Sequence, residues 1–154
     1  MDKNDPPRTF GVFKPVGHTL IAFYTEAELT SAVVALLDLG FAHSSLVQYN
    51  AAEMGAQVDA ELLSASPLAS FGYELDLIRL HGDLARKGCS FLVVDAPTDA
   101  LSAQVAALVH SIHPATAQHY GLLLIEDLTE KAPGPIGERE DPAQSSELER
   151  QQDA

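Results

Sequence analysis

One pattern in this chain occurs twice, and it restricts the possible folds more than any other feature. The apolar segment 20–22 reappears as 92–94, 72 positions further along. The apolar positions of 29–37 reappear in 101–109 at the same offset and without a gap. A repeat of this kind indicates two copies of one supersecondary unit.

The first copy predicts a strand, a helix and a second strand. Segment 18–24 is short and β-rich, which is typical of a strand buried on at least one face. Thr25 and Glu28 have the spacing of a capping box, and Gly40 follows the apolar helical positions as a C-terminal cap. Segment 44–49 supplies the second strand, so the unit is βαβ.

The second copy predicts strand 89–95, a helix capped by Thr98 or Asp99, and a last strand near 119–126. Two βαβ units predict an α+β fold of the ferredoxin-like plan, with a four-stranded antiparallel sheet and both crossover helices on one face. The plan places the first and third strands side by side and antiparallel. The alternative is a parallel α/β sheet with helices on both faces.

About 38 residues separate the two copies, and this length requires structure of its own. We expect a helical pair inserted at about 50–87, with Asn50 and Glu53 as a cap at its start and Gly88 at its end. The apolar positions expected to share a face are Met54, Val58 and Leu62 in the first helix and Leu77, Leu80 and Leu84 in the second. The pair would cover the open face of the sheet or contact a partner.

The composition divides the chain into three parts. With 154 residues, 46% of them hydrophobic, the chain is long enough for one domain with a substantial core, and we place that domain at 18–128. Segment 1–17 is expected to be a flexible leader and segment 129–154 a disordered acidic tail, because their polar composition offers little surface to bury.

The charge and the apolar pattern exclude several classes of function. A net charge of −13 disfavours binding to nucleic acid or anionic membranes. No apolar run is long enough to span a bilayer, and charged residues within 1–17 argue against a signal peptide, so we expect a soluble cytoplasmic protein. A single cysteine, Cys89, allows no internal disulfide.

Four residues are candidates for binding a small molecule or metal: His81, Cys89, His119 and Tyr120. Each is expected at or beside a strand end. His119 follows His110 and His113, and three histidines could bind zinc, copper or haem, although they also suit the polar end of a helix. Cys89 is either a ligand or a buried structural thiol.

The second inserted helix is rich in polar residues, and Glu74 shares a stripe with His81. Two helical turns separate these residues by about 10.5 Å, too far to bind one metal ion directly. The other charged residues of this helix suit surface ion pairs or contact with a partner. No phosphate-binding loop, dinucleotide fingerprint or nucleophile elbow is present, so no cofactor is assigned and an enzyme is disfavoured.

Three segments resemble small, largely uncharacterised bacterial proteins related loosely to the general-stress and heat-induced-stress families. They are 20–28, 80–97 and 117–128, and the resemblance spans 18–128. Relatives in these families often carry a glycine-rich or apolar central segment, whereas this chain has a polar helical pair there. The resemblance implies a stress-related role and supplies no catalytic residues.

Three functions are considered from these features. The first is a non-enzymatic, cytoplasmic, stress-related or accessory protein that acts through self-association, because ferredoxin-like sheets commonly bury a free face by dimerising. The second is a small-molecule or metal sensor that binds its ligand at a dimer seam through the four candidate residues. Oxygenase-like chemistry in a dimeric barrel is a third possibility.

Overall fold

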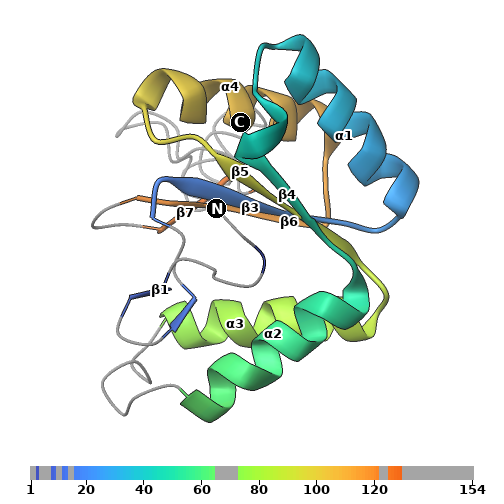
Figure 1. Ribbon diagram of the computed structural model, residues 1–154, viewed down its shortest axis with the longest axis vertical. Coiled ribbons are helices and arrows are strands. Elements are labelled where there is room, and N and C mark those ends of the chain that lie inside the picture. The colour runs from blue at the N-terminus through green and yellow to red at the C-terminus, as the bar shows by residue number, and fades with distance from the viewer. Residues whose placement is uncertain are drawn as a thin grey trace, which may run out of the picture.

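The computed structural model describes residues 3, 8–9, 12–13, 16–64, 73–121 and 125–129. Its elements, drawn in Figure 1, are β1 (Arg8–Thr9), β2 (Val12–Phe13), β3 (His18–Phe23), α1 (Glu26–Asp38), a 3₁₀ turn at His43–Ser45, β4 (Leu46–Tyr49), α2 (Ala51–Ser64), α3 (Tyr73–Arg86), β5 (Ser90–Asp95), α4 (Asp99–Ile112), β6 (Thr116–Tyr120) and β7 (Ile125–Asp127). The fold is α+β, as the sequence predicts.

The main sheet has five strands in the order β4-β5-β3-β6-β7, and every neighbouring pair is antiparallel. The expected four-stranded sheet is therefore wrong in its strand count. The expected last strand near 119–126 is divided: β6 ends at Tyr120, and β7 pairs back onto it with Ile125 opposite Tyr120. Gly121 follows β6. The apolar residues that come next in the sequence continue the pattern of the strand, so the pattern does not indicate that β6 ends there.

The pairing of β3 with β5 contains the symmetry of the sequence repeat. Leu20 lies opposite Val93, and Ile21 lies opposite Leu92. If each residue of the first pair is exchanged for its counterpart 72 positions away, the second pair results. The two strands are therefore related by a local two-fold axis, and the prediction that they lie side by side and antiparallel is confirmed.

The predicted helix ends are also present. Thr25 and Glu28 form a capping box at the start of α1, and the Thr98 hydroxyl accepts a hydrogen bond from a backbone N–H at the start of α4. Gly40 and Gly88 end α1 and α3 in the left-handed conformation, with φ of 101° and 86°. At each end two backbone hydrogen bonds close the last turn in the Schellman arrangement.

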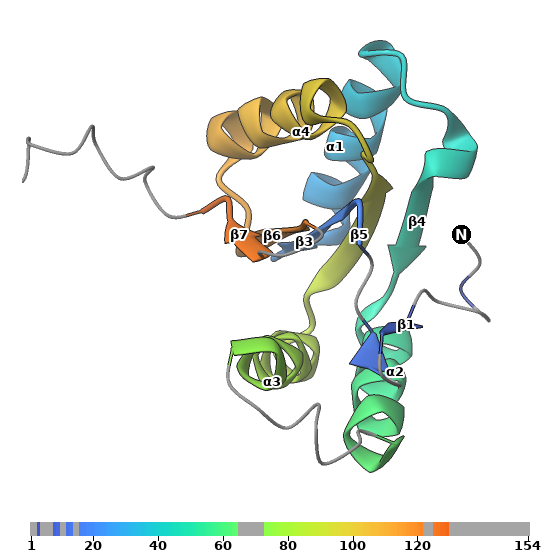
Figure 2. The same ribbon diagram turned by 90° about the vertical axis from the view of Figure 1, so that its left-hand side faces the viewer.

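Helices α1 and α4 cover one face of the sheet (Figure 2). Leu36 of α1 is completely buried there, and in α4 the equivalent buried residue is Val109, whereas Leu108 is only partly buried. The expected equivalence of Leu36 and Leu108 is therefore wrong by one position. Two residues separate the end of β5 from the Thr98 cap, whereas one residue separates the end of β3 from the Thr25 cap. Because of this extra residue, α4 is rotated about its axis relative to α1, and the buried position moves from Leu108 to Val109.

Helices α2 and α3 cover the opposite face, so the inserted pair takes the first of its two expected roles (Figure 2). The sheet therefore has no open face for dimerisation among the described residues. Met54 and Val58 point into this layer as expected. Leu62 does not, since it is 42% exposed, and Glu61 is buried at 1% instead.

The ends of the chain are described only in part. Gly17 donates its N–H to the carbonyl of Tyr120 and accepts a hydrogen bond from the N–H of Ala96, which ties the start of β3 to both neighbouring strands. Within the expected leader, β1 and β2 pair antiparallel as a separate two-stranded sheet. The expected flexibility of the rest of 1–17 and the expected disorder of the tail after Thr129 lie outside the described residues. Within the described part of the chain, every helix is too short or too polar to cross a membrane.

Candidate functional site

The four residues predicted as ligands lie on two different faces of the sheet. Successive side chains of a strand point to opposite faces, so His119 and Tyr120 diverge. Tyr120 and Cys89 pack in the layer under α2 and α3, and His81 reaches that layer from α3. His119 contacts Thr19 on the side of α1 and α4. No group of three or more metal-ligating side chains gathers anywhere in the described ranges.

His81 is held in a buried polar chain between α3 and β6. Its Nε2 lies 3.0 Å from Oε1 of Gln118, and Nε2 of Gln118 donates to the Thr116 hydroxyl at 2.5 Å. A carbonyl oxygen only accepts hydrogen bonds, so Nε2 of His81 carries the proton. The His81 ring packs on the Phe91 ring in a T-shaped arrangement, with the ring centroids 6.3 Å apart. These hydrogen bonds and the ring contact fix α3 on the sheet.

The environment of His81 keeps its imidazole neutral. Burial lowers its pKa to about 4, and the hydrogen bond with Gln118 opposes that effect. At neutral pH the ring is therefore a hydrogen-bond donor from Nε2 in the core. This is a structural role for the one histidine that the sequence places on the inserted pair.

Cys89 is a buried thiol in the same layer. Its backbone N–H donates to the carbonyl of Leu84, which places the side chain beneath the end of α3. Burial raises the pKa of the thiol, so the neutral form is favoured and nucleophilic reactivity is low. Of the two alternatives for Cys89, the geometry fits a structural thiol.

His119 lies near a small group of charges where β3, β6 and β7 meet. Its Nδ1 is 2.9 Å from the Thr19 hydroxyl, and Glu126 lies opposite it on β7. Burial is the main cause that lowers the pKa of His119, while Glu126 acts in the other direction. At the same end of the sheet, His18 approaches Asp95, with 3.6 Å between Nε2 and Oδ1. The arrangement joins neighbouring strands.

A different hollow, with a volume of about 370 Å³, opens between α1 and α4. We call it the α1–α4 hollow. Its walls include Phe23, Ala27 and Ser31 on one side and Ile112 and Pro114 on the other. Ala27, Ser31 and Val34 follow one another at helical spacing along α1, so the wall continues onto exposed helix surface.

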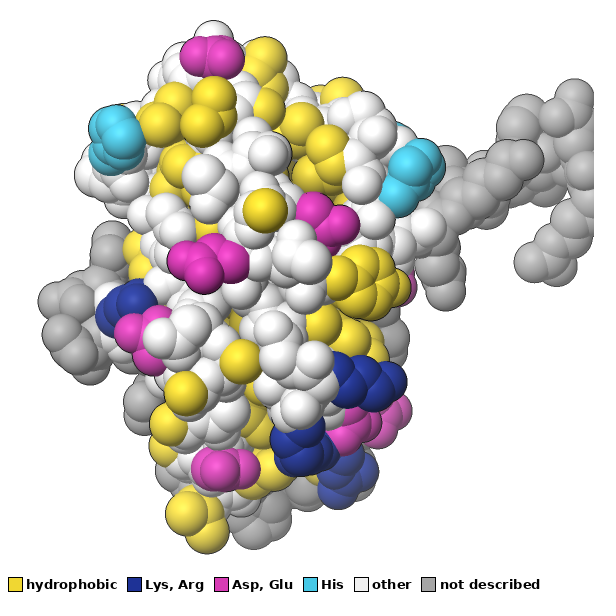
Figure 3. Space-filling view, turned by 90° about the vertical axis from the view of Figure 1, so that its right-hand side faces the viewer, with side chains coloured by type: hydrophobic (Ala, Val, Ile, Leu, Met, Phe, Trp, Pro, Cys, Tyr) yellow, Lys and Arg dark blue, Asp and Glu magenta, His cyan; other side chains and the backbone are white. Residues whose placement is uncertain are grey.

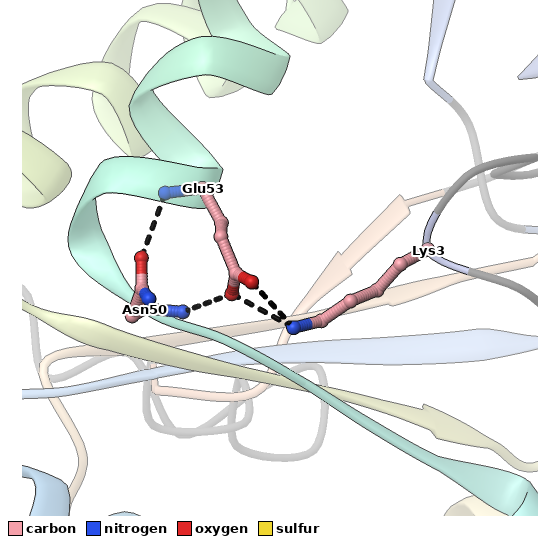
Figure 4. Close-up of polar contacts among 3 residues, drawn as sticks. All are labelled: Lys3, Asn50 and Glu53. Carbon is pink, nitrogen blue, oxygen red and sulfur yellow. Dashed lines mark hydrogen bonds and ion pairs between the residues drawn. The ribbon is translucent and has the colours of Figure 1, made fainter.

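A second polar arrangement lies on the opposite layer, at the junction of β4 and α2 (Figure 4). Glu53 accepts a hydrogen bond from the backbone N–H of Asn50 at 2.9 Å, and the Asn50 side chain accepts one from the N–H of Glu53 at 2.8 Å. The Lys3 ammonium lies 2.8 Å from both oxygens of Glu53 and 5.4 Å from the centre of the Tyr49 ring.

The basic side chains of α3 and of Lys87, the residue after it, form a separate exposed group. Arg79, Arg86 and Lys87 are all exposed, and Arg86 pairs with Asp83. In the view of Figure 3, Lys and Arg side chains gather at the lower right of the molecule. Contact with a partner through this surface stays a prediction.

Comparisons with known proteins give no relatives for this chain: no family model, no curated protein and no solved structure matches it.

The partners of the candidate residues could not be predicted from the sequence, and neither could the contact of Lys3 with Glu53 and Tyr49. Gln118, which holds His81, stands beside His119 in the sequence but faces the other layer. The alternation Thr116, Gln118, Tyr120 on one strand would have placed these three together. The contact of Lys3 with Glu53 joins positions 50 residues apart, and no local pattern indicates it.

Proposed function

We propose that this chain is a non-enzymatic, cytoplasmic accessory protein that acts by self-association through the surface of α1 and α4. The observation that carries the proposal is the α1–α4 hollow, with the exposed apolar residues beside it. Val34 of α1 is 53% exposed, and Ile112 at the end of α4 is 38% exposed. Exposed apolar surface next to an apolar hollow is typical of a protein contact.

The order of the strands supports a ferredoxin-like domain as the framework for this surface. Strands β6, β3, β5 and β4 are neighbours in that order, and two βαβ crossovers connect them. We propose that this is a ferredoxin-like plan to which β7 adds an edge strand and α2 and α3 add a second helical layer. The added layer covers one sheet face, and we assign the association to the outer side of α1 and α4, which cover the other face.

Charge opposes the association of two copies of the chain and so restricts where they can meet. Two copies that each carry −13 repel one another, so they can approach closely only where acidic groups are sparse. Of the residues lining the hollow, Glu28 is the one with a charge. A basic partner would instead require an acidic surface. In Figure 3, hydrophobic side chains also lie over the upper part of the molecule, where α1 runs.

Sedimentation equilibrium of the full chain at micromolar concentration tests the proposal. We expect a dimer, and we expect Ser31→Glu to convert it to monomer because the new carboxylate enters the contact from the wall of the hollow. Ala103→Glu is the matched control, since it adds the same charge at an exposed position of α4 outside the hollow. A monomeric wild-type chain, or equal effects of the two substitutions, would refute the proposal.

A stress-related role for this accessory protein rests on the resemblance of segments 20–28, 80–97 and 117–128 alone. The sensor hypothesis stays a prediction. Its four ligand candidates face two separate layers of the sheet, so a ligand at one seam would not reach all of them.

A further inference from the structure

The carboxylate of Glu53 is held in place by the start of α2. The reciprocal hydrogen bonds between Asn50 and Glu53 form a capping box, so the backbone itself orients the side chain. One oxygen, Oε2, accepts from the N–H of Asn50, and both oxygens still face outward to the Lys3 ammonium (Figure 4). Glu53 is therefore an oriented anionic group whose position does not depend on Lys3.

Tyr49 supplies the second half of the arrangement. It is the last residue of the edge strand β4, and its buried ring has the Lys3 ammonium 5.4 Å from its centre. The face of an aromatic ring attracts a cation within about 6 Å of its centre. A carboxylate and a ring face that converge on one point both attract an alkylammonium ion. We call Glu53 and Tyr49 the ammonium cradle.

Two adjoining hollows extend from the cradle, with volumes of about 320 and 280 Å³. The larger one runs from Glu53 to a second carboxylate, Glu26, at the start of α1. Its lining also includes the uncharged polar side chains of Gln48 and Ser90. The hollow therefore has two carboxylates and several hydrogen-bonding groups, and Lys3, which lines it too, pairs with one of the carboxylates.

We propose that the ammonium cradle and the larger hollow bind an alkyl diamine, and that Lys3 is the chain's own competitor for the cradle. One ammonium of the ligand takes the place of the Lys3 ammonium on Glu53 and Tyr49, and the other lies toward Glu26. The net charge of −13 attracts such a dication over a long range. This inference goes beyond the proposed self-association and does not depend on it.

Lys3 is suited to displacement. Its side chain is 40% exposed, and that of Glu53 is 41% exposed, so solvent screens the ion pair and it contributes little to stability. A tethered competitor acts by lowering the fraction of time in which the site is open. The apparent affinity for a free amine is therefore weaker than the affinity of the vacated cradle, and removal of the Lys3 ammonium should reveal the difference.

Isothermal titration of the full chain with 1,5-diaminopentane tests the inference. We expect Lys3→Ala to bind the diamine about tenfold more tightly than the wild type, the change expected if Lys3 occupies the cradle about 90% of the time. Adding Glu53→Gln to Lys3→Ala should abolish the binding. Glutamine retains the capping box, so the helix start is preserved. Adding Asp59→Asn is the matched control, because it removes one exposed charge from α2 outside the hollows and should leave the binding unchanged.

The monoamine 1-aminopentane distinguishes the diamine from a single ammonium group, such as a peptide lysine. It lacks the charge that would lie toward Glu26, so we expect it to bind Lys3→Ala distinctly more weakly than the diamine. Equal binding of the two probes would overturn the assignment of a diamine. No heat of binding to Lys3→Ala at millimolar diamine, or equal losses from Glu53→Gln and Asp59→Asn, would overturn the site itself.

Discussion

The buried imidazole of His81 makes the stability of this protein depend on pH in a direction that can be derived. In the unfolded chain His81 takes up a proton below its ordinary pKa of 6.5, whereas burial lowers its pKa in the folded protein to about 4. Between these values the unfolded state binds more protons, so a falling pH favours unfolding. The contribution of His81 to stability is complete above pH 6.5 and is lost as the pH falls toward 4.

The size of the effect follows from the two pKa values. The difference between the pKa values of the unfolded and folded states corresponds to about 3 kcal/mol of unfolding free energy. Between the two pKa values, the free energy of unfolding changes by up to about 1.4 kcal/mol for each pH unit. This is a substantial part of the roughly 5 to 15 kcal/mol by which a domain is usually stable. The loss should be accompanied by detachment of α3, because protonation forces the ring away from its buried place against Gln118 and Phe91.

Urea unfolding followed by far-UV circular dichroism at several pH values between 7.5 and 4.5 measures the effect. His81→Gln is the comparison variant, since its amide can donate to Gln118 but does not titrate. His119, whose pKa burial also lowers, contributes equally to both proteins. We expect the free energy of unfolding of the wild type to fall more steeply than that of the variant below pH 6.5. Parallel curves would refute the reasoning.

Three further predictions concern the core and the helix ends, all measured on the purified chain. Leu36→Ala should lower the free energy of unfolding by about 2 to 5 kcal/mol, and Leu108→Ala by distinctly less, because Leu108 is only partly buried; equal costs in urea unfolding would contradict the rotation of α4. Gly40→Ala should destabilise the protein by about 1 kcal/mol or more, because Gly40 has a φ of 101°. Gly55→Ala within α2 should stabilise it, and a change of the same sign in the free energy of unfolding for both variants would argue against the cap. Cys89 should react with a disulfide reagent only when the protein unfolds, and rapid reaction of the native chain would show that the thiol is not buried.

The sequence predicts the local elements and the central strand pairing of this fold because their signals are local or repeated. Thr25 with Glu28 and the glycine at position 40 mark helix ends through hydrogen bonds to residues only a few positions away. The repeat predicts the pairing of β3 with β5 because two copies of one unit have to satisfy the same packing. The extra residue before Thr98 is too small a change to disturb the apolar pattern, so the rotation of α4 was not predicted.

The candidate site was less predictable, since its contacts join distant parts of the chain. His81 and Gln118 are 37 positions apart, and Lys3 and Glu53 are 50 apart. Side-chain type alone indicates His81, His119 and Cys89 as possible ligands, and the environment then decides their roles. The packing of α2 and α3 on the sheet buries His81 and Cys89 as parts of the core. No single segment of the sequence contains that information.

Amide hydrogen exchange at low and high protein concentration tests the proposed self-association most directly, because it reports both the event and its place. We predict that raising the concentration slows exchange at the end of α4 near Ile112 and along α1 from Ala27 to Val34, while β4 and α2 exchange at unchanged rates. Exchange that does not depend on concentration, or protection confined to β4 or α2, would contradict association through the α1–α4 surface.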